Sequence, residues 1–488
     1  MDPYAAAPGT PQRKEITGMS LTQKVKALFG TKALLDGRTA AGEIPPAEKL
    51  YGRFLRLAGP SVIEAVLVAL VGIVDTIMVS TLGDLAIDAV GISTQPKFVI
   101  LCFIFALSTG TTAVVARRKG QDDRKGANAV LRSVFFIGLG IILLLTFLGR
   151  VYAEPFLRFA GAHDSYIEDA VVYFRIICLS LIFQGLNVLI NSAQKGSGNT
   201  KISMTTNLIG NLVNIFFNWL LINGIGPFPR LEVKGAAIAT LIGAMAACAI
   251  SVARLFIRKN YLNVFEDAGW KPSFPVLKPV FKVSSSALVE QLIMRFGFFT
   301  FNMIVAKLDP LSYATHIICM NFMSLSFCFG DGFQVAATAL AGQSLGAKRP
   351  DLAYMYCGIG RRVVVIVSTV LSMFFITMRY PLMRLYTDTP EIIEMGGVCL
   401  LMLSVITYTQ TAQVICTGCL RGAGDTRYTA MISLIAIGII RPLSGYVFAY
   451  VVGWGLYGAW FGTLVDQTLR MVLSSARVRR GRWLEIQL

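Results

Sequence analysis

Charged residues and histidines are scarce in this sequence, and common active-site motifs are missing from it. Asp, Glu, Lys and Arg make up 15% of the 488 residues, against roughly 25% in a typical soluble domain. The only histidines, His163 and His316, cannot form an H-E-x-x-H zinc motif. The G-x-x-x-x-G-K-S/T loop that binds nucleoside triphosphates is also missing. The sequence therefore argues against an enzyme and against direct use of ATP.

Long hydrophobic runs take the place of charge. Hydrophobic residues make up 55% of the chain, and the mean hydropathy is +0.62. Apolar runs of about twenty residues, the length that crosses a bilayer as one helix, recur along the sequence. We count twelve, at 54–81, 89–116, 128–150, 170–193, 202–224, 234–257, 279–307, 313–343, 355–379, 393–417, 428–452 and 455–476. They predict an all-α integral membrane protein, since a β-barrel would show shorter, alternating segments.

The basic residues are concentrated in particular connections. The chain has 45 Lys and Arg against 28 Asp and Glu, a net charge of +17. Basic clusters lie at 117–125, 254–282, 348–362 and 477–482, whereas most loop acids lie in the intervening connections. By the positive-inside rule, this pattern predicts a multi-pass protein of the inner cell membrane with both termini in the cytoplasm. The partner that this charge implies is the lipid bilayer rather than nucleic acid.

The sequence repeats itself after 226 positions. Glu64 matches Glu290, and KGSGNTK at 195–201 matches RGAGDTR at 421–427. Later the spacing becomes 223, where GAAIATLI matches GAWFGTLV. Because each unit holds an even number of spans, both units begin on the same side of the membrane. We therefore predict two pseudo-symmetric six-helix lobes related by an axis along the membrane normal.

Five segments follow from this organisation. They are a cytoplasmic basic tail at 1–50, an N-terminal six-helix lobe at 51–257, a cytoplasmic linker at 258–278, a C-terminal six-helix lobe at 279–476 and a cytoplasmic basic tail at 477–488. Apolar residues recur at helical spacing in the first tail, at Leu21, Val25, Leu28 and Phe29. That stretch fits an interfacial amphipathic helix and a disordered basic tail equally well.

Two carboxylates interrupt the first span, and an amide stripe runs along the fifth. Glu64 and Asp75 are eleven positions apart, so on a helix they share one face at a separation of about 16 Å. Ionised groups in hydrocarbon are costly and usually functional, so that face should meet protein or water. The fifth span carries four amides at helical spacing, Asn207, Asn211, Asn214 and Asn218. We favour a cavity lining over helix-to-helix contacts for such a stripe.

Depth within the spans predicts a site in the outer half of the first lobe. Asp75 and Asn218 lie near the outer ends of their spans, and Asn214 lies one turn deeper than Asn218. Thr240 lies near the outer end of the sixth span. These oxygens suit a small hard cation such as Na⁺, or a carboxylate that takes up H⁺. We predict that these four residues form a cation-coupling site. They bind a metal ion only if the coupling ion is Na⁺, and we expect no other cofactor. A lone acid at low dielectric favours H⁺.

The other charged residues inside spans fit a structural role as well as a functional one. Glu290 is a candidate for binding cationic substrate, and Arg295, little more than one turn away, suits a structural ion pair with it instead. Asp466 and Arg470 have the i, i+4 spacing of a simple pair. For Asp331 and Arg441 a structural pair is at least as good an explanation, and His316 suits packing. The substrate or second-lobe candidates are Glu290, Asn207, Asn211, Glu64, Asp331 and Arg295.

These residues together resemble a known family. VDTIMVSTLG followed by AIDAVGIS, KGSGNTK, NIFFNWLLINGIG with VKGAAIATLIG, and ATALAGQSLGA occur in this order across two repeats. Over residues 51–478 the sequence resembles the multidrug and toxic compound extrusion (MATE) transporters, and within them the prokaryotic branch. The resemblance implies two lobes around a V-shaped cleft. It also implies export of small organic, often cationic amphipathic compounds, driven by inward Na⁺ or H⁺.

The resemblance also assigns individual positions. Asp75 matches the coupling aspartate of the first helix, Asn214 a family asparagine of the fifth, and Thr240 the threonine of the GAAIAT motif. Asn218 departs from the pattern, because similar proteins usually have Asp there, and an amide cannot take up a proton. Asp75 would then titrate alone. Glu290 fits a seventh-helix glutamate of some members, but the tenth span has no carboxylate at membrane depth, so a second-lobe cation site would be incomplete.

Three functions fit the sequence to different degrees. The leading prediction is a secondary active multidrug exporter, working as a monomer by cation antiport with alternating access. A lipid-linked precursor flippase of the same superfamily would favour more helices or a strongly cationic central cavity. A membrane-embedded enzyme is disfavoured because the chain has no histidine–carboxylate cluster.

Overall fold

The computed structural model describes residues 29–225, 229–266 and 273–488, and all regular secondary structure in them is helical. The all-α prediction is therefore confirmed. Leu21, Val25 and Leu28 of the predicted amphipathic stretch, and residues 267–272 of the predicted linker, lie outside the described residues.

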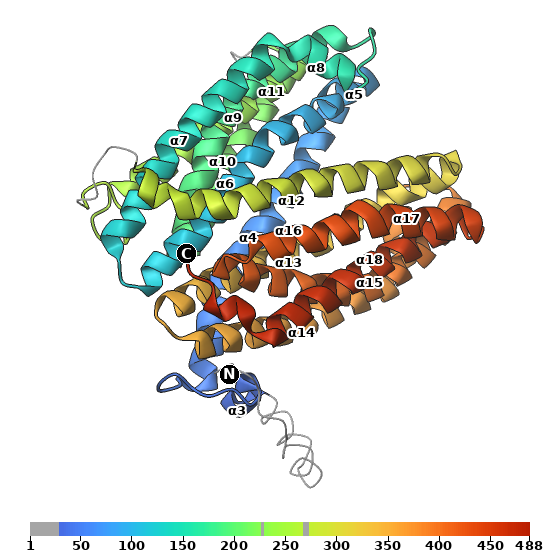
Figure 1. The fold of residues 1–488 in the computed structure, drawn as a ribbon. Coiled ribbons are helices and arrows are strands. Elements are labelled where there is room, and N and C mark those ends of the chain that lie inside the picture. Colours follow the sequence, from blue (N-terminus) through green and yellow to red (C-terminus); the bar gives the residue numbers. More distant parts are fainter. Residues whose placement is uncertain (1–28, 226–228, 267–272) are drawn as a thin grey trace. The chain divides into compact units, whose positions relative to one another are not determined.

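The helices follow one another along the chain with short connections (Figure 1). Two π-helical segments, Leu434–Ile440 and Val447–Val451, alternate with short α-helices in one continuous stretch. The α-helices are α3 (Thr31–Leu35), α4 (Ala47–Ser80), α5 (Asp84–Ile92), α6 (Thr94–Gly120), α7 (Arg124–Val151), α8 (Ala153–Phe159), α9 (Ile167–Gly196), α10 (Thr200–Asn223), α11 (Glu232–Leu255), α12 (Phe274–Ala306), α13 (Pro310–Gly346), α14 (Pro350–Arg384), α15 (Pro390–Ala423), α16 (Thr426–Ser433), α17 (Arg441–Tyr446) and α18 (Gly455–Arg480).

Within the described residues, eleven helical stretches are long and apolar enough to cross a membrane. α5 and α6 count together as Leu85–Gly120, and α16 with the helical turns after it counts as Thr426–Val451. α18 supplies the twelfth predicted span and has 26 residues. It carries Asp466 and Arg470, which are buried inside the protein. Hydropathy alone does not mark α18 because these charges are hidden from lipid by neighbouring helices rather than absent.

The helices form two compact units, each with its own apolar core. One comprises Ile63–Leu288, and the other comprises Val289–Leu488 with the chain before Ile63. The division falls inside α4 and α12 rather than in the predicted linker. The first part of α4 packs with the second repeat, where Phe54 and Phe333 stack with ring centroids 6.4 Å apart. In the same way, Val280 of α12 lies in the core of the first unit.

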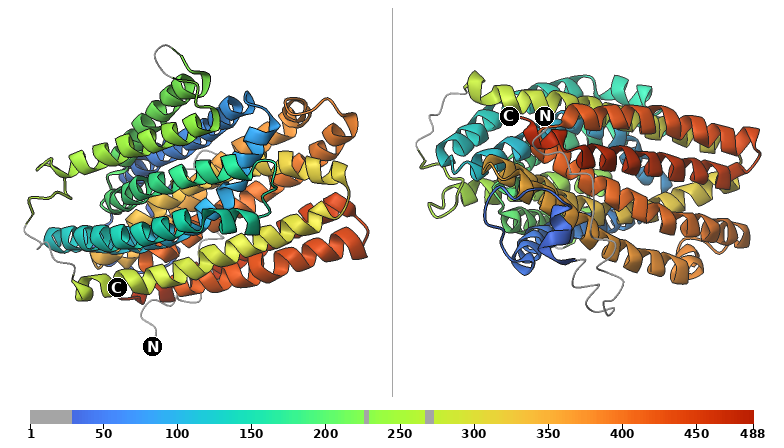
Figure 2. Two further views of the ribbon diagram at one scale, coloured as in Figure 1. Left: turned by 90° about the horizontal axis from the view of Figure 1, so that it is seen from above. Right: turned by 60° about the horizontal axis from the view of Figure 1, so that its bottom comes forward.

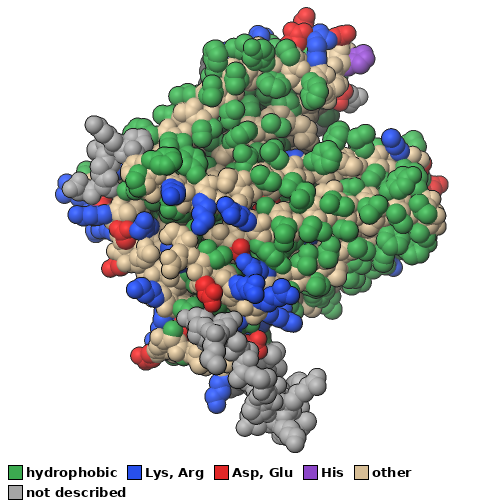
Figure 3. Space-filling model, in the orientation of Figure 1, with side chains coloured by type: hydrophobic (Ala, Val, Ile, Leu, Met, Phe, Trp, Pro, Cys, Tyr) green, Lys and Arg blue, Asp and Glu red, His purple; other side chains and the backbone are tan. Residues whose placement is uncertain are grey.

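The surface of each unit suits a lipid surrounding. Within one unit, helices such as α10 and α11 pack along each other (Figure 2). Hydrophobic side chains cover the sides of the helices on the face drawn in Figure 3, and lysine and arginine gather near the C-terminus. Val370 and Met373 of α14 are 65% and 66% exposed. Apolar side chains so exposed along a long helix are the expected covering of a membrane span.

Close packing of α10 on α11 positions two of the predicted site residues. Gly243 of α11 faces Asn214 of α10, where an added Cβ would lie 2.7 Å from the Asn214 Cβ. Gly210 approaches Ala247 to the same distance one turn away. Small residues allow membrane helices to approach closely in this way. The approach brings Thr240 of α11 next to the amide stripe of α10.

Candidate functional site

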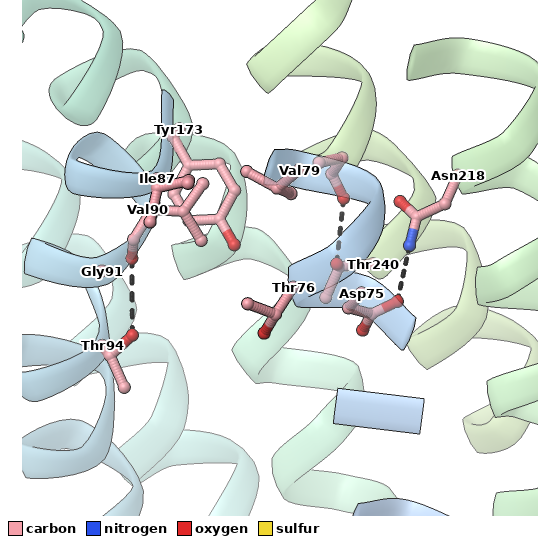
Figure 4. A pocket seen from close by; sticks show the side chains of 11 residues that line it. Asp75, Thr76, Val79, Ile87, Val90, Gly91, Thr94, Tyr173, Asn218 and Thr240 are labelled. Carbon is pink, nitrogen blue, oxygen red and sulfur yellow. Dashed lines mark hydrogen bonds between the residues drawn. The ribbon is translucent and has the colours of Figure 1, made fainter. Parts of the chain in front are cut away.

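The predicted site residues of the first repeat lie together. Asn218 Nδ2 donates to Asp75 Oδ1 at 2.7 Å, which joins α10 to α4 (Figure 4). Asn214, one turn away on α10, accepts from Asn218 at 3.5 Å and donates to Thr240 Oγ1 at 3.4 Å. The structure thus brings Asp75, Asn214, Asn218 and Thr240 to one place. Their function as a coupling site stays a prediction.

Turning the Asn214 amide improves this cluster. With its oxygen and nitrogen exchanged, Nδ2 lies 3.0 and 3.3 Å from the Asp75 carboxylate oxygens, and Oδ1 lies 3.2 Å from the backbone nitrogen of Thr240. The orientation of an amide is assigned from its hydrogen-bond network, and this one gives both ends a complementary partner. Two amide N–H groups then face one carboxylate.

A cavity of about 190 Å³ opens beside Asp75. Tyr173 of α9 stands between Asp75 and the apolar side chains of α5, which include Ile87 and Val90 (Figure 4). Thr240 lines the cavity from α11. Pockets for drug-sized ligands usually measure roughly 300–1,000 Å³. This cavity is smaller and suits a coupling cation with a few waters rather than a whole organic substrate.

Two residues near Asp75 escaped the sequence analysis. Lys97 of α6 is half-buried and lies within Coulombic range of Asp75, and so does the phenol of Tyr173. Lys97 lies inside the predicted span 89–116, so a search for cations within spans would have found it. No pattern in the sequence marks Tyr173. Asp75 therefore has a cationic neighbour in addition to its amides.

Glu64 forms a second polar cluster on α4. Its Oε1 accepts hydrogen bonds from Asn207 at 2.6 Å, Ser203 at 2.9 Å and Lys195 at 3.0 Å. The Glu64 side chain is 8% exposed and that of Lys195 is 22% exposed. Glu64 Oε2 is buried and has no hydrogen-bond partner among the described residues. The cluster joins α4, the end of α9 and the start of α10.

Glu290 of α12 repeats this cluster in the second unit. Its Oε1 accepts from Arg421 at 2.9 Å and from Ser433 at 3.0 Å, and its Oε2 accepts from Thr429 at 3.0 Å. Glu290 is 1% exposed, and its salt bridge is with Arg421. Arg295, the expected neighbour, is exposed on α12. The three partners of Glu290 lie 226 positions after those of Glu64, as the pairs Lys195 and Arg421, Ser203 and Thr429, Asn207 and Ser433. A role for Glu290 in substrate binding stays a prediction.

A buried salt bridge joins α17 and α18. Arg441 and Asp466 are 3.0 Å apart, with side chains 1% and 0% exposed. The guanidinium also lies over the ring of Phe298 at 4.6 Å and that of Phe301 at 5.7 Å. The salt bridge of Asp466 is thus with Arg441 and not with Arg470, four residues along α18. Helical spacing suggested the nearer partner, but packing of α17 on α18 provides a buried one.

The remaining candidates are placed as follows. Asn211 is half-buried on α10, and Asp331 is exposed on α13. His316 is buried between the rings of Phe301 and Trp460, with Nε2 3.1 Å from an oxygen of Asn302. That surrounding suits the packing role expected for His316.

Comparisons with known proteins place the chain in a family. The MatE family model matches residues 60–220 and 286–447. The chain is 28% identical over 451 residues to YisQ of Bacillus subtilis, described as an uncharacterized transporter, covering 90% of this chain and 96% of that protein. It is 26% identical over 444 residues to a probable multidrug resistance protein NorM of Thermotoga maritima, covering 90% and 94%.

Solved structures show the same fold. An outward-facing multidrug resistance MATE family transporter of the MOP superfamily superposes with a TM-score of 0.83 at 20% identity, covering 89% of this chain and 97% of that one. A MATE protein in complex with MaD3S gives 0.82 at 21% identity, covering 93% and 99%. The predicted fold, twelve transmembrane helices in two pseudo-symmetric six-helix lobes, is confirmed. With the family model matched in both repeats, this multi-pass membrane protein belongs to the MatE family of multidrug transporters.

Proposed function

We propose that this protein is a secondary active exporter of small organic, often cationic amphipathic compounds, which it exchanges for H⁺ or Na⁺ by alternating access. It works as a monomer in the inner membrane with both termini in the cytoplasm, and it needs no cofactor beyond the coupling ion. Family membership and relatives named for multidrug resistance support the substrate class. Asp75 carries the proposal of antiport, because it is a lone carboxylate held by amides beside a small cavity.

The orientation of the amides favours H⁺ over Na⁺. Asn218 presents its nitrogen to Asp75, and its oxygen is buried without a hydrogen-bond partner among the described residues. Because Na⁺ binds through oxygen ligands, both amides would have to turn to hold it. A proton binds Asp75 without oxygen ligands from the amides. Burial also disfavours the charged form of the acid. The positive charge of Lys97 opposes either cation and so favours its release.

The driving force depends on the charge of the substrate. Inward movement of each monovalent cation releases about 2.3 kcal/mol of free energy per 100 mV of membrane potential, inside negative. A tenfold concentration gradient adds about 1.4 kcal/mol. For a neutral substrate both contributions drive export. For a monovalent organic cation exchanged one for one, the potential terms cancel and only the gradient of the coupling ion remains.

The test uses purified protein in proteoliposomes with a pH gradient and a Na⁺ gradient imposed separately. The probe is ethidium, a fluorescent organic cation. We expect the pH gradient to drive ethidium transport in the wild type. Asp75→Asn should lower the initial rate by at least about tenfold, which corresponds to about 1.4 kcal/mol. Ethidium binding and the thermal unfolding temperature should change little, since the amide is close to isosteric.

The matched control is Asp88→Asn, the same change on α5 at an exposed acid. It should transport ethidium at the wild-type rate. If Asp75→Asn also exports ethidium against a gradient at the wild-type rate, the coupling site lies elsewhere. Glu290 is then the first residue to examine.

A further inference from the structure

α4 and α10 are tied by two carboxylate–amide bonds with the same spacing on both helices. Glu64 accepts from Asn207 at 2.6 Å, and Asp75 accepts from Asn218 at 2.7 Å. The acids are eleven residues apart on α4, and the amides are eleven residues apart on α10. The two bonds therefore lie about 16 Å apart along the helices. Between them α10 carries the other two asparagines of the stripe, Asn211 and Asn214, whereas the α4 residues between the two acids are apolar.

The orientation of the inner amide is fixed by a further bond. Asn187 Nδ2 of α9 donates to Asn207 Oδ1 at 2.8 Å. Because the oxygen of Asn207 is engaged by this bond, its nitrogen is the end that faces Glu64. The inner acid, like the outer one, is therefore presented with an amide donor and not an amide oxygen.

Glu64 has an oxygen that its cluster leaves unused. All three of its donors bind Oε1, and Oε2 is buried without a hydrogen-bond partner among the described residues. The equivalent positions around Glu290 supply donors to both oxygens, because Thr429 donates to Oε2. An unsatisfied buried acceptor costs about 1–3 kcal/mol, and more for a charged group. A proton on Glu64 Oε2 would remove the uncompensated charge, and a small cation would give that oxygen a partner.

Only the first repeat has an outer acid in line with its inner one. The residue 226 positions after Asp75 is Phe301, which is 3% exposed within an apolar core. The second repeat therefore keeps the Glu290 cluster without a carboxylate at the position that matches Asp75. Glu64 Oε2, which has no donor, belongs to the repeat that also has Asp75. Glu290 Oε2, which accepts from Thr429, belongs to the repeat that lacks such an acid. A role as a simple tie between helices would not account for this difference.

We propose that Glu64 is a second station for the coupling cation, nearer the cytoplasm than Asp75, and that the seam between α4 and α10 connects the two. The inference deepens the proposed function and rests on it for the inward direction of cation movement. In the case of H⁺, the O–H bond at Asp75 breaks and Asp75 becomes a carboxylate. Water in the seam carries the proton, which forms a new O–H bond at Glu64 Oε2. Glu64 becomes neutral.

Lys195 gives this station a means of release. When Glu64 is protonated, the ammonium of Lys195 loses its counter-charge and repels the added proton. The Lys195 side chain is 22% exposed, so solvent lies close to the end of the path. The charged group that faces Glu64 is Lys195 from α9, and α10 adds the neutral Ser203 and Asn207. The groups facing Asp75 are Lys97 and Tyr173.

The test counts protonating carboxyl groups directly. Infrared difference spectra of the full chain in lipid vesicles, without substrate, are recorded between about pH 5 and pH 8, above the usual range of a free Glu at about 4.3. Glu64→Gln should remove one titrating carboxyl band from the wild-type spectrum. Glu290→Gln, the same change in the matched cluster, should remove none. If Glu64→Gln leaves the carboxyl bands unchanged, Glu64 does not exchange protons and the inference is wrong.

Transport measurements supply the second arm. Under a pH gradient, Glu64→Gln should lower the initial rate of ethidium efflux by about tenfold while ethidium binding changes by less than about twofold. Glu64→Asp, which keeps a carboxylate, should recover part of the rate. Glu290→Gln should still respond to the pH gradient. Equal loss of rate and of thermal stability in both glutamine variants would make both clusters structural ties and would overturn the inference.

The two arms separate failure of this inference from failure of the proposed function. If the wild type moves no ethidium under either gradient, antiport is wrong for that probe. The infrared result then still decides whether Glu64 exchanges a proton.

Discussion

The two repeats share a polar cluster around Glu64 and Glu290, here called the inner cluster. They differ at the positions of Asp75 and Phe301, here called the outer level. Around Glu64 and Glu290, a basic side chain and two neutral donors come from matching positions of the repeat. Eleven residues further along, the first repeat has Asp75 and the second has the buried Phe301. In both repeats the inner cluster joins the middle of a long helix to two further helices. At the level of Asp75 and Phe301 the two repeats differ.

At that outer level the second repeat contains a cation of its own. Gly243 packs against Asn214 in the first repeat, and its counterpart 223 positions later is Asp466, which binds Arg441. Arg441 also lies over Phe301, the counterpart of Asp75. In this comparison an exchangeable external cation in one lobe corresponds to a fixed guanidinium in the other. The proposal that only the first repeat couples to a cation rests on this difference.

The helix beside the site differs as well. In the first repeat α5 and α6 are interrupted at Ser93, whereas α13 runs without a break from Pro310 to Gly346. α5 supplies Ile87 and Val90 to the cavity beside Asp75. The short helix α5, which ends at this interruption, therefore lines the proposed cation site.

The most decisive way to break the comparison is to test whether the repeats share one orientation. His163→Cys and Asp388→Cys, in loops that follow the third and ninth spans, should react with a membrane-impermeant maleimide from outside. Asp122→Cys and Lys348→Cys occupy matching turns after the second and eighth spans, both with φ near +57°, and should not react. The expected effect is all or none, because the bilayer blocks the reagent.

Eight of the nine native cysteines are buried, so the wild type serves as the background control. Labelling of His163→Cys without Asp388→Cys would show that the two repeats are inverted rather than parallel. Labelling of both inner turns from outside would reverse the predicted topology.

Asp466→Asn should produce the next largest effect. It leaves the Arg441 guanidinium buried without its partner, and breaking a buried pair in this way costs about 3–5 kcal/mol. The loss is measured as a lower thermal unfolding temperature and lower folded yield in detergent. The double variant Arg441→Met with Asp466→Leu removes both charges and should recover most of the stability. Normal stability of Asp466→Asn with lost transport would instead make this pair functional.

Much of the fold and part of the site followed from the sequence. Apolar length and the 226-residue repeat predicted the helices and their duplication, because span length is set by bilayer thickness. Helical spacing and depth placed Asp75, Asn214, Asn218 and Thr240 at one level, and these residues do lie together. Their function still awaits experiment.

Partner choice between distant helices could not be predicted in this way. Glu290 takes Arg421, 131 residues away, although Arg295 is near it in sequence. Asp466 takes Arg441 although Arg470 is four residues away. Spacing fixes which face of a helix a side chain occupies, but packing decides which helix meets that face. The same reason explains why Tyr173 beside Asp75 was missed.

Asn218→Asp should make the first repeat a two-acid site and change its ion dependence. Two carboxylates this close disfavour joint ionisation, so the pair retains one proton to higher pH. We expect the alkaline limb of the pH–rate profile for ethidium efflux to move upward by about one pH unit, a tenfold change in proton concentration. Asn211→Asp, about two turns away on the same helix, is the control. An unchanged profile in Asn218→Asp would remove residue 218 from the coupling site.

The smallest expected effect concerns how the second span of each repeat begins. In the second repeat, Asp309 caps α13 and accepts from the backbone nitrogen of Ser312 at 2.7 Å. Its counterpart is Gly83, which has φ of +98° and makes no side-chain cap. That conformation favours glycine, so the first repeat cannot carry the same cap. Asp309→Ala should lower the free energy of unfolding by about 1 kcal/mol at neutral pH, the usual value of an N-cap.

The pH dependence of this loss identifies its cause. Hydrogen bonds from the side chain and backbone of Ser312 hold the pKa of Asp309 below its ordinary value. The stabilisation is therefore fully present above the unfolded pKa of about 3.9 and is lost as the pH falls through the folded value. Asp309→Asn, which keeps an acceptor for the cap, should match the wild type at neutral pH and should lack this pH dependence. If Asp309→Ala differs from the wild type equally at neutral and acid pH, the hydrogen bond to the ionised carboxylate is not what stabilises the start of α13.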